Sequence, residues 1–227
     1  MKHVMVSGAG GSLGEAVVKK FLQEGYMVSG IARSKQKNSE SVKNLHLIDV
    51  DLSDEAAVEQ MVEAEVKRHG KIDVAVLTAG GFAMGSIKES KSSDILQQYK
   101  LNFETAYNLA RPVFLQMQKQ GHGRIFFIGS RPGIEASKSK GMTGYGLSKS
   151  LVIRLSDLIN EEALGTDVVS TVIIPSIIDT PPNRSAMPDA DFSKWVKAEE
   201  IADIIYRHST PEMNALRETV LKVYGRS

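Results

Sequence analysis

Tyr145 and Lys149 are four residues apart in a stretch of helical periodicity, so we expect both side chains on one helix face, one turn apart. A free phenol has a pKa of about 10 and is a poor base at neutral pH. A nearby ammonium group is expected to lower that pKa, which makes proton exchange with an alcohol or carbonyl oxygen feasible. Because such pairs also occur by chance in many helices, the interpretation depends on the residues around them.

Two other polar side chains can serve the same chemistry. Ser130 follows directly after a predicted strand and can donate a hydrogen bond to the oxygen that Tyr145 protonates. Asn102 lies in a predicted helix and can hold a water molecule that relays protons from Lys149. All four residues are expected at one edge of a sheet, in an order that is hard to obtain by accident.

A glycine-rich turn connects the first predicted strand to a helix. Its small side chains let the backbone turn tightly and direct free amide N–H groups at one place, which predicts an anion site. By itself, such a glycine-rich run can also be explained as an ordinary tight turn between a strand and a helix, without any ligand. Its position at the start of an alternating strand and helix pattern favours a dinucleotide site. The residues concerned are Ser7, Gly8, Gly10, Gly11, Ser12, Leu13 and Gly14.

The end of the second predicted strand discriminates between the two nicotinamide dinucleotides. A carboxylate at this place binds the ribose hydroxyls, but this chain has Arg33 and Ser34, and a guanidinium can fork around a 2′-phosphate. We therefore expect NADP(H) to be favoured over NAD(H), with an ordinary solvated charge as the alternative for Arg33. Asp51 and Leu52 are expected to hold the adenine, although Asp51 can equally cap the next helix. The predicted dinucleotide contacts also include Ala79, Gly80 and Gly81.

Short β-branched runs alternate with longer helical stretches, which predicts an α/β fold of the Rossmann type: a doubly wound, seven-stranded parallel sheet with helices on both faces. The predicted strands are Val4–Val6, Met27–Ala32, Leu45–Val50, Val74–Thr78, Arg124–Gly129, Val168–Ile174 and Thr219–Tyr224. The predicted helices are Glu15–Glu24, Glu55–His69, Asp94–Gln120, Tyr145–Leu164 and Ala198–His208. Three segments without a period, Gly80–Ser93, Arg131–Gly144 and Pro175–Lys197, each follow a strand, so we expect them together at the carboxyl edge, where such sheets bind ligands.

Length and charge narrow the class of protein. We interpret residues 1–227 as a single catalytic domain with a substrate loop at about 175–197. The 28 basic and 27 acidic side chains nearly cancel, so neither nucleic acid nor an anionic membrane is an expected partner. There is no cysteine for a disulfide or a thiolate metal site. With no signal-peptide pattern before the first strand and no long apolar run, we expect a soluble, cytoplasmic protein.

The histidines indicate no metal centre. They are scattered along the sequence, and we see neither the i, i+4 pairing nor the nearby acid that metal ligation needs. We interpret them as structural or surface residues and predict no metal. The five positions are His3, His46, His69, His122 and His208.

The chain resembles the short-chain dehydrogenase/reductase family along nearly its whole length. The family's Y-x-x-x-K motif corresponds to Tyr145 through Lys149, its strand-end serine to Ser130 and its helix asparagine to Asn102. The segment from Pro175 to Thr180 is similar to the family's proline segment, which covers the nicotinamide. The resemblance implies that the Ile178 backbone and Thr180 bind the carboxamide, and that Lys149 also holds the ribose.

The resemblance has three departures. Ser7 and Ser12 replace a threonine and a glycine of the family's glycine motif, and Thr78 replaces the asparagine of its N-A-G motif. Ser130 also precedes Tyr145 by two residues more than is usual, so the intervening loop must bulge to bring both to one substrate atom. Within the family, the pattern after Asp179 is most similar to dihydropteridine reductases and related bacterial reductases.

The predicted function is hydride transfer between a nicotinamide and the carbonyl or imine carbon of a small molecule, with Tyr145 as acid or base. The open substrate alternatives are a quinonoid pterin, a 3-oxoacyl thioester and a generic ketone or aldehyde. A non-catalytic dinucleotide-sensing regulator is a rival, and an S-adenosylmethionine methyltransferase is a weaker one, since it leaves Tyr145 and Lys149 unexplained. The family resemblance implies a homodimer or homotetramer that pairs the helices Asp94–Gln120 and Tyr145–Leu164.

Overall fold

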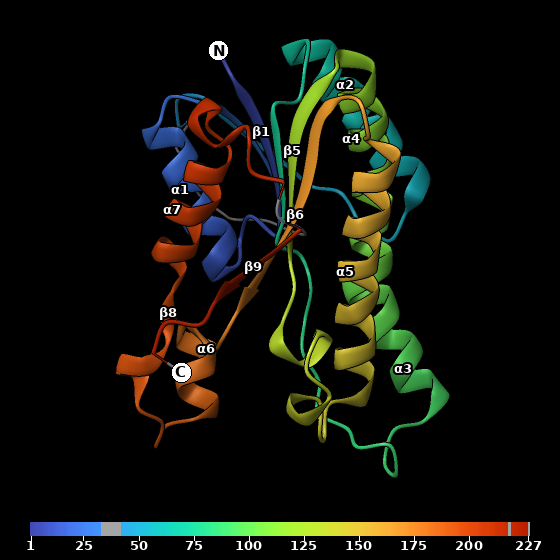
Figure 1. Ribbon diagram of the computed structural model, residues 1–227, viewed down its shortest axis with the longest axis vertical. Coiled ribbons are helices and arrows are strands. Elements are labelled where there is room, and N and C mark those ends of the chain that lie inside the picture. Colours follow the sequence, from blue (N-terminus) through green and yellow to red (C-terminus); the bar gives the residue numbers. More distant parts are fainter. Residues whose placement is uncertain (33–41, 218, 227) are drawn as a thin grey trace.

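A parallel β-sheet forms the centre of the computed structural model, which describes residues 1–32, 42–217 and 219–226 (Figure 1). Seven strands pair in the order β3-β2-β1-β4-β5-β6-β9, every pair is parallel, and the predicted sheet is confirmed. These strands are β1 (His3–Ser7), β2 (Met27–Ile31), β3 (Leu45–Ile48), β4 (Val74–Leu77), β5 (His122–Ile128), β6 (Asp167–Pro175) and β9 (Val220–Val223). A two-stranded ladder pairs β7 (Ile178–Asp179) with β8 (Val196–Lys197).

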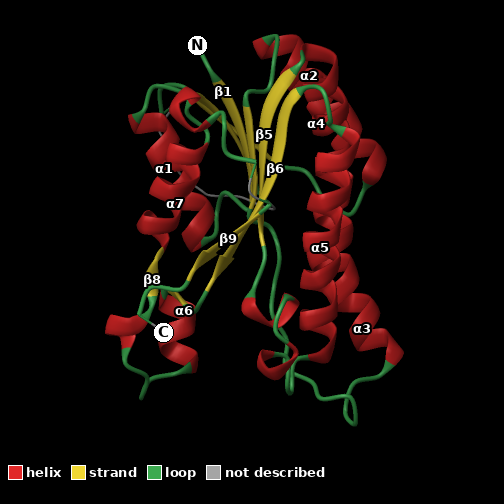
Figure 2. Cartoon of the chain, in the orientation of Figure 1, coloured by secondary structure: helices red, strands yellow, loops and turns green. Residues whose placement is uncertain are grey.

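Helices cover both faces of the sheet (Figure 2). The helices are α1 (Ser12–Gln23), α2 (Glu55–His69), α3 (Ser92–Gln98), α4 (Thr105–Gln120), α5 (Thr143–Glu162), α6 (Pro181–Ala186) and α7 (Ala198–His208). Helices α1 and α7 lie on one face, and α2, α4 and α5 lie on the other. Each layer has its own apolar core, because strands covered on both sides must bury both sets of side chains.

Local signals account for where several helices begin and end. The Asp54 carboxylate accepts a hydrogen bond from Ala57 N and caps the start of α2. Helices α2 and α4 end at Gly70 and Gly121, both with a φ of +82°, a left-handed conformation that favours glycine. These ends agree with the sequence pattern.

The predicted single helix Asp94–Gln120 is wrong in one respect. A π-helical segment, Tyr99–Glu104, separates α3 from α4, and Asn102 lies inside it. A π-helical turn inserts one extra residue, so it changes which of the following side chains face inward. Such segments often accompany functional sites.

The three aperiodic segments contain more local structure than their sequence indicates. The loop between Ser130 and Tyr145, which is two residues longer than usual, contains two single 3₁₀ turns that make it more compact. These turns are Arg131–Gly133 and Ala136–Lys138. Gly85 pairs with Met142, so the loops after β4 and β5 are joined. The third segment contains β7, α6 and β8.

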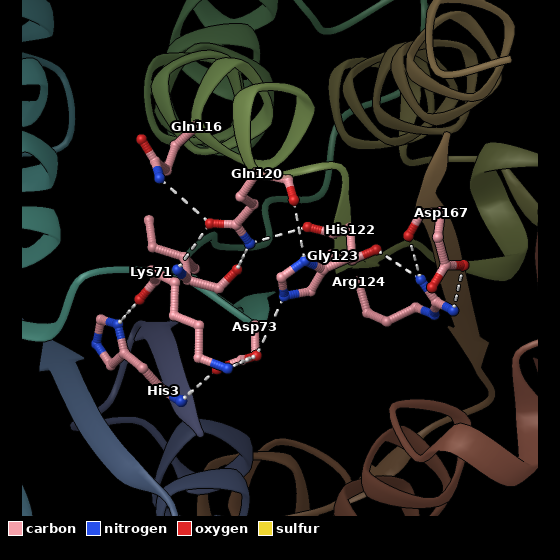
Figure 3. Close-up of polar contacts among 10 residues, drawn as sticks. His3, Lys71, Asp73, Gln116, Gln120, His122, Gly123, Arg124 and Asp167 are labelled. Carbon is pink, nitrogen blue, oxygen red and sulfur yellow. Dashed lines mark hydrogen bonds and ion pairs between the residues drawn. The ribbon is translucent and has the colours of Figure 1, made fainter. Parts of the chain in front are cut away.

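Side-chain hydrogen bonds hold the amino-terminal edge of the sheet, opposite the carboxyl edge from which the three loops leave (Figure 3). Asp73 accepts from the His3 backbone N–H and from Lys71 Nζ, both at 2.8 Å. Arg124 donates to the backbone and carboxylate oxygens of Asp167. These bonds tie the amino-terminal ends of neighbouring strands and leave the carboxyl edge free for a site.

In the described ranges, no helix combines the length and the apolarity needed to cross a membrane.

Candidate active site

The glycine turn between β1 and α1 can be formed only by very small residues. Gly8 has a φ of +66°, and a Cβ there would lie 2.8 Å from Thr78 Oγ1 and 2.9 Å from Ala79 N. A Cβ on Gly14 would lie 2.1 Å from the Gly8 carbonyl oxygen, so the first turn of α1 touches the loop backbone directly. Glycine at these two positions therefore lets the backbone of the turn pack directly against β4 and the start of the helix.

Thr78 provides a physical reason why the departures at Ser7 and Thr78 are tolerated. Thr78 Oγ1 donates to the Ser7 carbonyl oxygen at 2.6 Å, and Ala79 N donates to Ser7 Oγ at 3.2 Å. The two hydroxyl side chains thereby join the ends of β1 and β4 directly beneath the turn.

The start of α1 has the properties of an anion site. Gly11 occupies the capping position without a side-chain hydrogen bond, and Gly11 N donates to the Gly8 carbonyl oxygen. The backbone N–H groups of Ser12 and Leu13 belong to the first turn of a helix, where they have no intrahelical acceptor and carry the positive end of the helix dipole. Gly10 lies within the same turn and is exposed.

A cleft of about 250 Å³ extends from this turn along the carboxyl edge of the sheet. Leu52 and Ala79 line it, and their contacts with a dinucleotide remain predictions. Asp51 Oδ1 accepts from the backbone and hydroxyl of Ser53, whereas Asp54 caps α2, so the alternative role of Asp51 as that cap is not realised. Its predicted adenine contact remains a prediction. The lining residues are Gly8, Gly11, Ile31, Ala32, Val50, Leu52, Thr78, Ala79, Gly80, Leu101 and Thr105.

Arg33 and Ser34, the residues expected to select between the two dinucleotides, lie outside the described residues. The last described residue before them is Ala32, which lines the cleft. The selection therefore stays a sequence-based prediction.

Lys149 is the most deeply buried ionisable group at the carboxyl edge. Helix α5 starts at Thr143, so Tyr145 and Lys149 lie on its first two turns, and their predicted shared face is confirmed. Lys149 Nζ donates to the Ile128 carbonyl oxygen at 2.9 Å and lies 5.9 Å from the centre of the Tyr145 ring. Burial lowers the pKa of Lys149 from its ordinary value of 10.5 to about 8.

The expected lowering of the Tyr145 pKa is wrong for this structure. Burial raises the pKa of the phenol, and the nearby Ser130 hydroxyl opposes that shift. The physical reason is that a phenolate loses hydration in this pocket, while the Lys149 ammonium is directed to the Ile128 carbonyl oxygen. A phenol that stays protonated at neutral pH is suited to donate a proton.

Ser130 lies beside Tyr145 despite the longer loop between them. Its Oγ is buried and has no hydrogen-bond partner among the described residues. A buried hydroxyl without a partner is costly, so it is explained if the site supplies a partner on binding. The 3₁₀ turns after Ser130 make the bulge that this arrangement requires.

Asn102 links the π-helical segment to the loop after β4. Its Oδ1 accepts from Gly81 N at 3.0 Å, and its Nδ2 donates to Gln98 Oε1 at 3.2 Å. A Cβ on Gly80 would lie 2.6 Å from Asn102 Oδ1 and 3.5 Å from Lys149 Nζ, so these three residues converge as predicted. Sequence reasoning missed Gln98, although its i, i+4 spacing from Asn102 is a usable signal.

The proline segment after β6 folds into the ladder of β7 and β8. Pro175 ends β6, and the Ile178 carbonyl oxygen accepts from Asn183 Nδ2 at 2.8 Å. Thr180 Oγ1 accepts from Asn183 N and caps α6, which leaves its O–H free to donate. Hydrogen bonds to Asn183 therefore hold Ile178 and Thr180 in place, while their contacts with a nicotinamide carboxamide stay a prediction.

Comparison with known proteins agrees with this geometry. The family model of short chain dehydrogenase matches residues 2–191. This chain belongs to the short-chain dehydrogenase family. It is accordingly an NAD(P)-dependent oxidoreductase.

Relatives of this short-chain dehydrogenase are distant but cover almost the whole chain. An uncharacterised oxidoreductase of Staphylococcus epidermidis is 24% identical over 97% of this chain and 96% of its own length. A dihydropteridine reductase of Dictyostelium discoideum is 27% identical over 92% of this chain and 88% of its own. The 3-oxoacyl-[acyl-carrier-protein] reductase FabG of Thermotoga maritima is 25% identical over 99% and 96%.

Solved structures share the fold. The structure of ElxO with NADP bound has a TM-score of 0.90 and 24% identity, and covers 99% of this chain and 97% of its own. Serine dehydrogenase from Escherichia coli has a TM-score of 0.83 and 24% identity, and covers 97% and 96%. At these identities the likeness establishes the architecture and leaves the substrate open.

The residues of this short-chain dehydrogenase fit the dinucleotide that its family uses. Glycine at positions 8 and 14 lets the turn pack directly on the start of α1, where the first-turn backbone N–H groups can bind a pyrophosphate. The ring of Phe82 packs edge to face on Tyr145, with the ring centroids 5.0 Å apart. Only the fold brings that aromatic contact together, since 63 residues of chain separate the two positions.

Proposed function

We propose that residues 1–227 form one catalytic domain that reduces a carbonyl or imine group of a small molecule with NADPH. The observation that carries the proposal is the meeting of three groups at the carboxyl edge: the Tyr145 phenol, the buried Lys149 ammonium and the buried Ser130 hydroxyl. An intact set of this kind favours an enzyme over a dinucleotide-sensing regulator.

The chain's own residues divide the work as follows. When bound, the nicotinamide supplies the hydride. Tyr145 donates its proton to the substrate oxygen, and its raised pKa keeps that proton in place at neutral pH. Ser130 donates a hydrogen bond to the same oxygen and thereby fixes its position.

The remaining polar residues support these two hydroxyls. Lys149 provides positive charge behind Tyr145 and holds the ribose, and Asn102 orients the loop at Gly81 through its amide oxygen. The first turn of α1 binds the pyrophosphate through backbone N–H groups. Pro175, the Ile178 backbone and Thr180 cover the nicotinamide.

The preference for NADP(H) is tested by calorimetric titration of the full chain with NADPH and NADH in parallel. We expect tighter binding of NADPH, and we expect Arg33→Ala to remove the difference because it removes the guanidinium that pairs with the 2′-phosphate. Arg207→Ala, an exposed arginine on α7, is the matched control and should keep the preference. Equal affinities in the wild type would contradict the NADP assignment, and failure of both dinucleotides to bind would contradict the proposed function itself.

The substrate is a small molecule whose class the relatives leave open. A quinonoid pterin, a 3-oxoacyl thioester and a simple ketone or aldehyde are all compatible with an acid at Tyr145. A panel of these three classes, followed by the loss of nicotinamide absorbance, separates them.

The predicted cytoplasmic location is tested by fractionation of cells, and recovery in another compartment would contradict it.

We further propose a homo-oligomer in which α4 and α5 pair with the same helices of a second copy. Apolar side chains on the outer faces of these helices are one-third to one-half exposed, which is unfavourable in water. Spacings of four, seven and eight residues place them on one side of each helix. The residues are Tyr107 and Leu115 on α4, and Leu147, Leu151 and Leu158 on α5.

The oligomer is tested by light scattering coupled to size exclusion. We expect a mass of two or four chains, and we expect Leu151→Arg to shift it towards one chain because a charge in the apolar stripe must be desolvated on pairing. Leu164→Arg, just beyond the end of α5, is the control and should leave the mass unchanged. A wild-type protein that elutes as one chain would contradict the pairing.

A further inference from the structure

A second cluster of polar side chains lies far from the catalytic residues, at the amino-terminal edge of the sheet. His3 is the first residue of β1, whereas the glycine turn follows its last residue, Ser7. Glu65 and His69 lie on the last turns of α2, and their side chains point at His3. The expectation that the histidines lack i, i+4 pairing and a nearby acid is therefore wrong: Glu65 and His69 are such a pair.

The donor atoms of these three residues converge. One ligand atom from each of His3, Glu65 and His69 lies within 4.8 Å of the other two. His69 Nε2 is 3.5 Å from Glu65 Oε2, and the rings of His3 and His69 pack with their centroids 4.2 Å apart. Donors that share one tetrahedral Zn²⁺ lie about 3.4 Å apart, given bond lengths of about 2.1 Å, so this spacing needs only small side-chain rotations.

The orientation of His3 is the one that a metal ligand needs. Its Nδ1 lies 2.9 Å from the Lys71 carbonyl oxygen (Figure 3). Because a carbonyl oxygen can only accept, Nδ1 carries the hydrogen, and Nε2 is the ring nitrogen available to the cluster. Histidines that bind metals almost always donate their other ring nitrogen to a carbonyl or carboxylate in this way. A neutral imidazole with Nδ1–H presents its lone pair at Nε2.

Glu65 is also held as a ligating carboxylate would be. The fully buried Ser29 hydroxyl contacts both Glu65 Oε2 and His3 Nε2, the latter at 2.8 Å, and its single hydrogen can satisfy only one of these two acceptor atoms at a time. The other carboxylate oxygen, Oε1, contacts His46 Nδ1 at 3.1 Å and Arg68 Nε at 3.4 Å. The neighbouring positive charge of Arg68 therefore meets the oxygen turned away from His3 and His69.

We propose that His3, Glu65 and His69 bind one divalent transition metal ion, with Zn²⁺ as the best match to two imidazoles and one carboxylate. Burial supports this, because His3 and Glu65 are each at most 2% exposed, and a site without competing water favours a cation held by a carboxylate. His46, whose side chain is 38% exposed, borders the cluster on its solvent side and marks the route of entry. The ion would tie β1 to the end of α2.

This ion would have a structural role, because its ligands are at the opposite ends of the strands from Tyr145 and Ser130. Residues that hold β1 and α2 together at this edge affect the stability of the fold rather than the transfer of hydride. The metal site and the proposed reaction can therefore fail independently.

The test is a calorimetric titration of the full, untagged chain with Zn²⁺ alone, after treatment with a chelator. We expect binding of one equivalent, and we expect His69→Gln and Glu65→Gln each to weaken it at least tenfold, as loss of one ligand from a three-residue site should. His208→Gln is the matched control, since His208 contacts the Ile204 carbonyl oxygen on α7, away from this cluster, and it should bind Zn²⁺ as the wild type does.

A second measurement distinguishes loss of the metal site from misfolding of a variant. Co²⁺ bound by imidazole nitrogens at low coordination number absorbs visible light strongly, so titration of the folded wild type reports the ligand set directly. Visible bands that appear in the wild type and in His208→Gln but vanish in His69→Gln support the site. No binding of either metal to the wild type, or binding that survives both ligand substitutions, would overturn the proposal and leave a self-contained hydrogen-bond network.

Discussion

Replacing Tyr145 by phenylalanine is expected to lower kcat/KM for carbonyl reduction by about 10²- to 10⁴-fold, the usual contribution of a positioned general acid. The substitution removes one oxygen atom and keeps the ring that packs on Phe82 at 5.0 Å, so the fold should be retained. Dinucleotide binding should also persist, because the glycine turn and Lys149 are unaffected. Steady-state loss of nicotinamide absorbance measures the rate, and calorimetry measures the binding.

Ser150→Ala is the matched control for this prediction. Its hydroxyl donates to the Leu147 carbonyl oxygen on the same helix, so it removes one oxygen from α5 without touching the site. We expect it to turn over substrate as the wild type does. Wild-type turnover by Tyr145→Phe would show that another group donates the proton.

Replacing Lys149 by methionine is expected to reduce activity and to raise stability at neutral pH. The charge that supports Tyr145 and holds the ribose is lost, so kcat/KM should fall by about 10²-fold or more. The folded state also no longer has to bury an ammonium group whose pKa burial lowers from 10.5 to about 8. That shift corresponds to about 3 kcal/mol of unfavourable free energy in the folded wild type at pH 7. The variant is relieved of this cost but loses the hydrogen bond to the Ile128 carbonyl oxygen, which is worth about 1 kcal/mol.

The pH dependence gives this second prediction its sign. Between about pH 8 and the ordinary lysine pKa, the unfolded wild type binds more protons than the folded wild type, so wild-type stability rises with pH in that window. The methionine variant lacks this rise. We therefore expect Lys149→Met to be about 1–2 kcal/mol more stable than the wild type at pH 7 and to lose that advantage above about pH 10.

Urea denaturation at pH 7 and at pH 10 measures both effects, with Lys119→Met as the control because Lys119 is an exposed lysine at the end of α4. The control should show no such reversal. A Lys149→Met variant that is less stable than the wild type at pH 7 would contradict the burial of an uncompensated charge.

The regular elements were predictable because they depend on local patterns. Buried parallel strands are short β-branched runs, and the glycine turn, Ser130, Tyr145 and Lys149 keep a fixed order along them, so the sheet and its ligand edge follow from the sequence. Their shared location follows from one rule, that loops after parallel strands leave the same edge.

The features that were missed depend on burial and on contacts between distant residues. The π-helical turn at Asn102 adds one residue inside an otherwise helical stretch, and the low helix propensity of one asparagine does not distinguish it from an ordinary helix. The direction of the Tyr145 pKa depends on how much water the folded pocket excludes, which spacing does not reveal. His3 reaches Glu65 across 62 positions of chain, and only the i, i+4 spacing of Glu65 and His69 was visible beforehand.

The most direct test of the central claim follows deuterium from NADPH dideuterated at C4 into the product. Wild type and Tyr145→Phe are each incubated with the carbonyl and pterin panel, and the products are analysed by mass spectrometry. The account predicts one deuterium on the former carbonyl or imine carbon of at least one panel member with the wild type, and a labelled yield at least about 10²-fold lower with Tyr145→Phe over the same time. Reduced carbonyl products without deuterium on that carbon, or equal labelling by the two proteins, would contradict it.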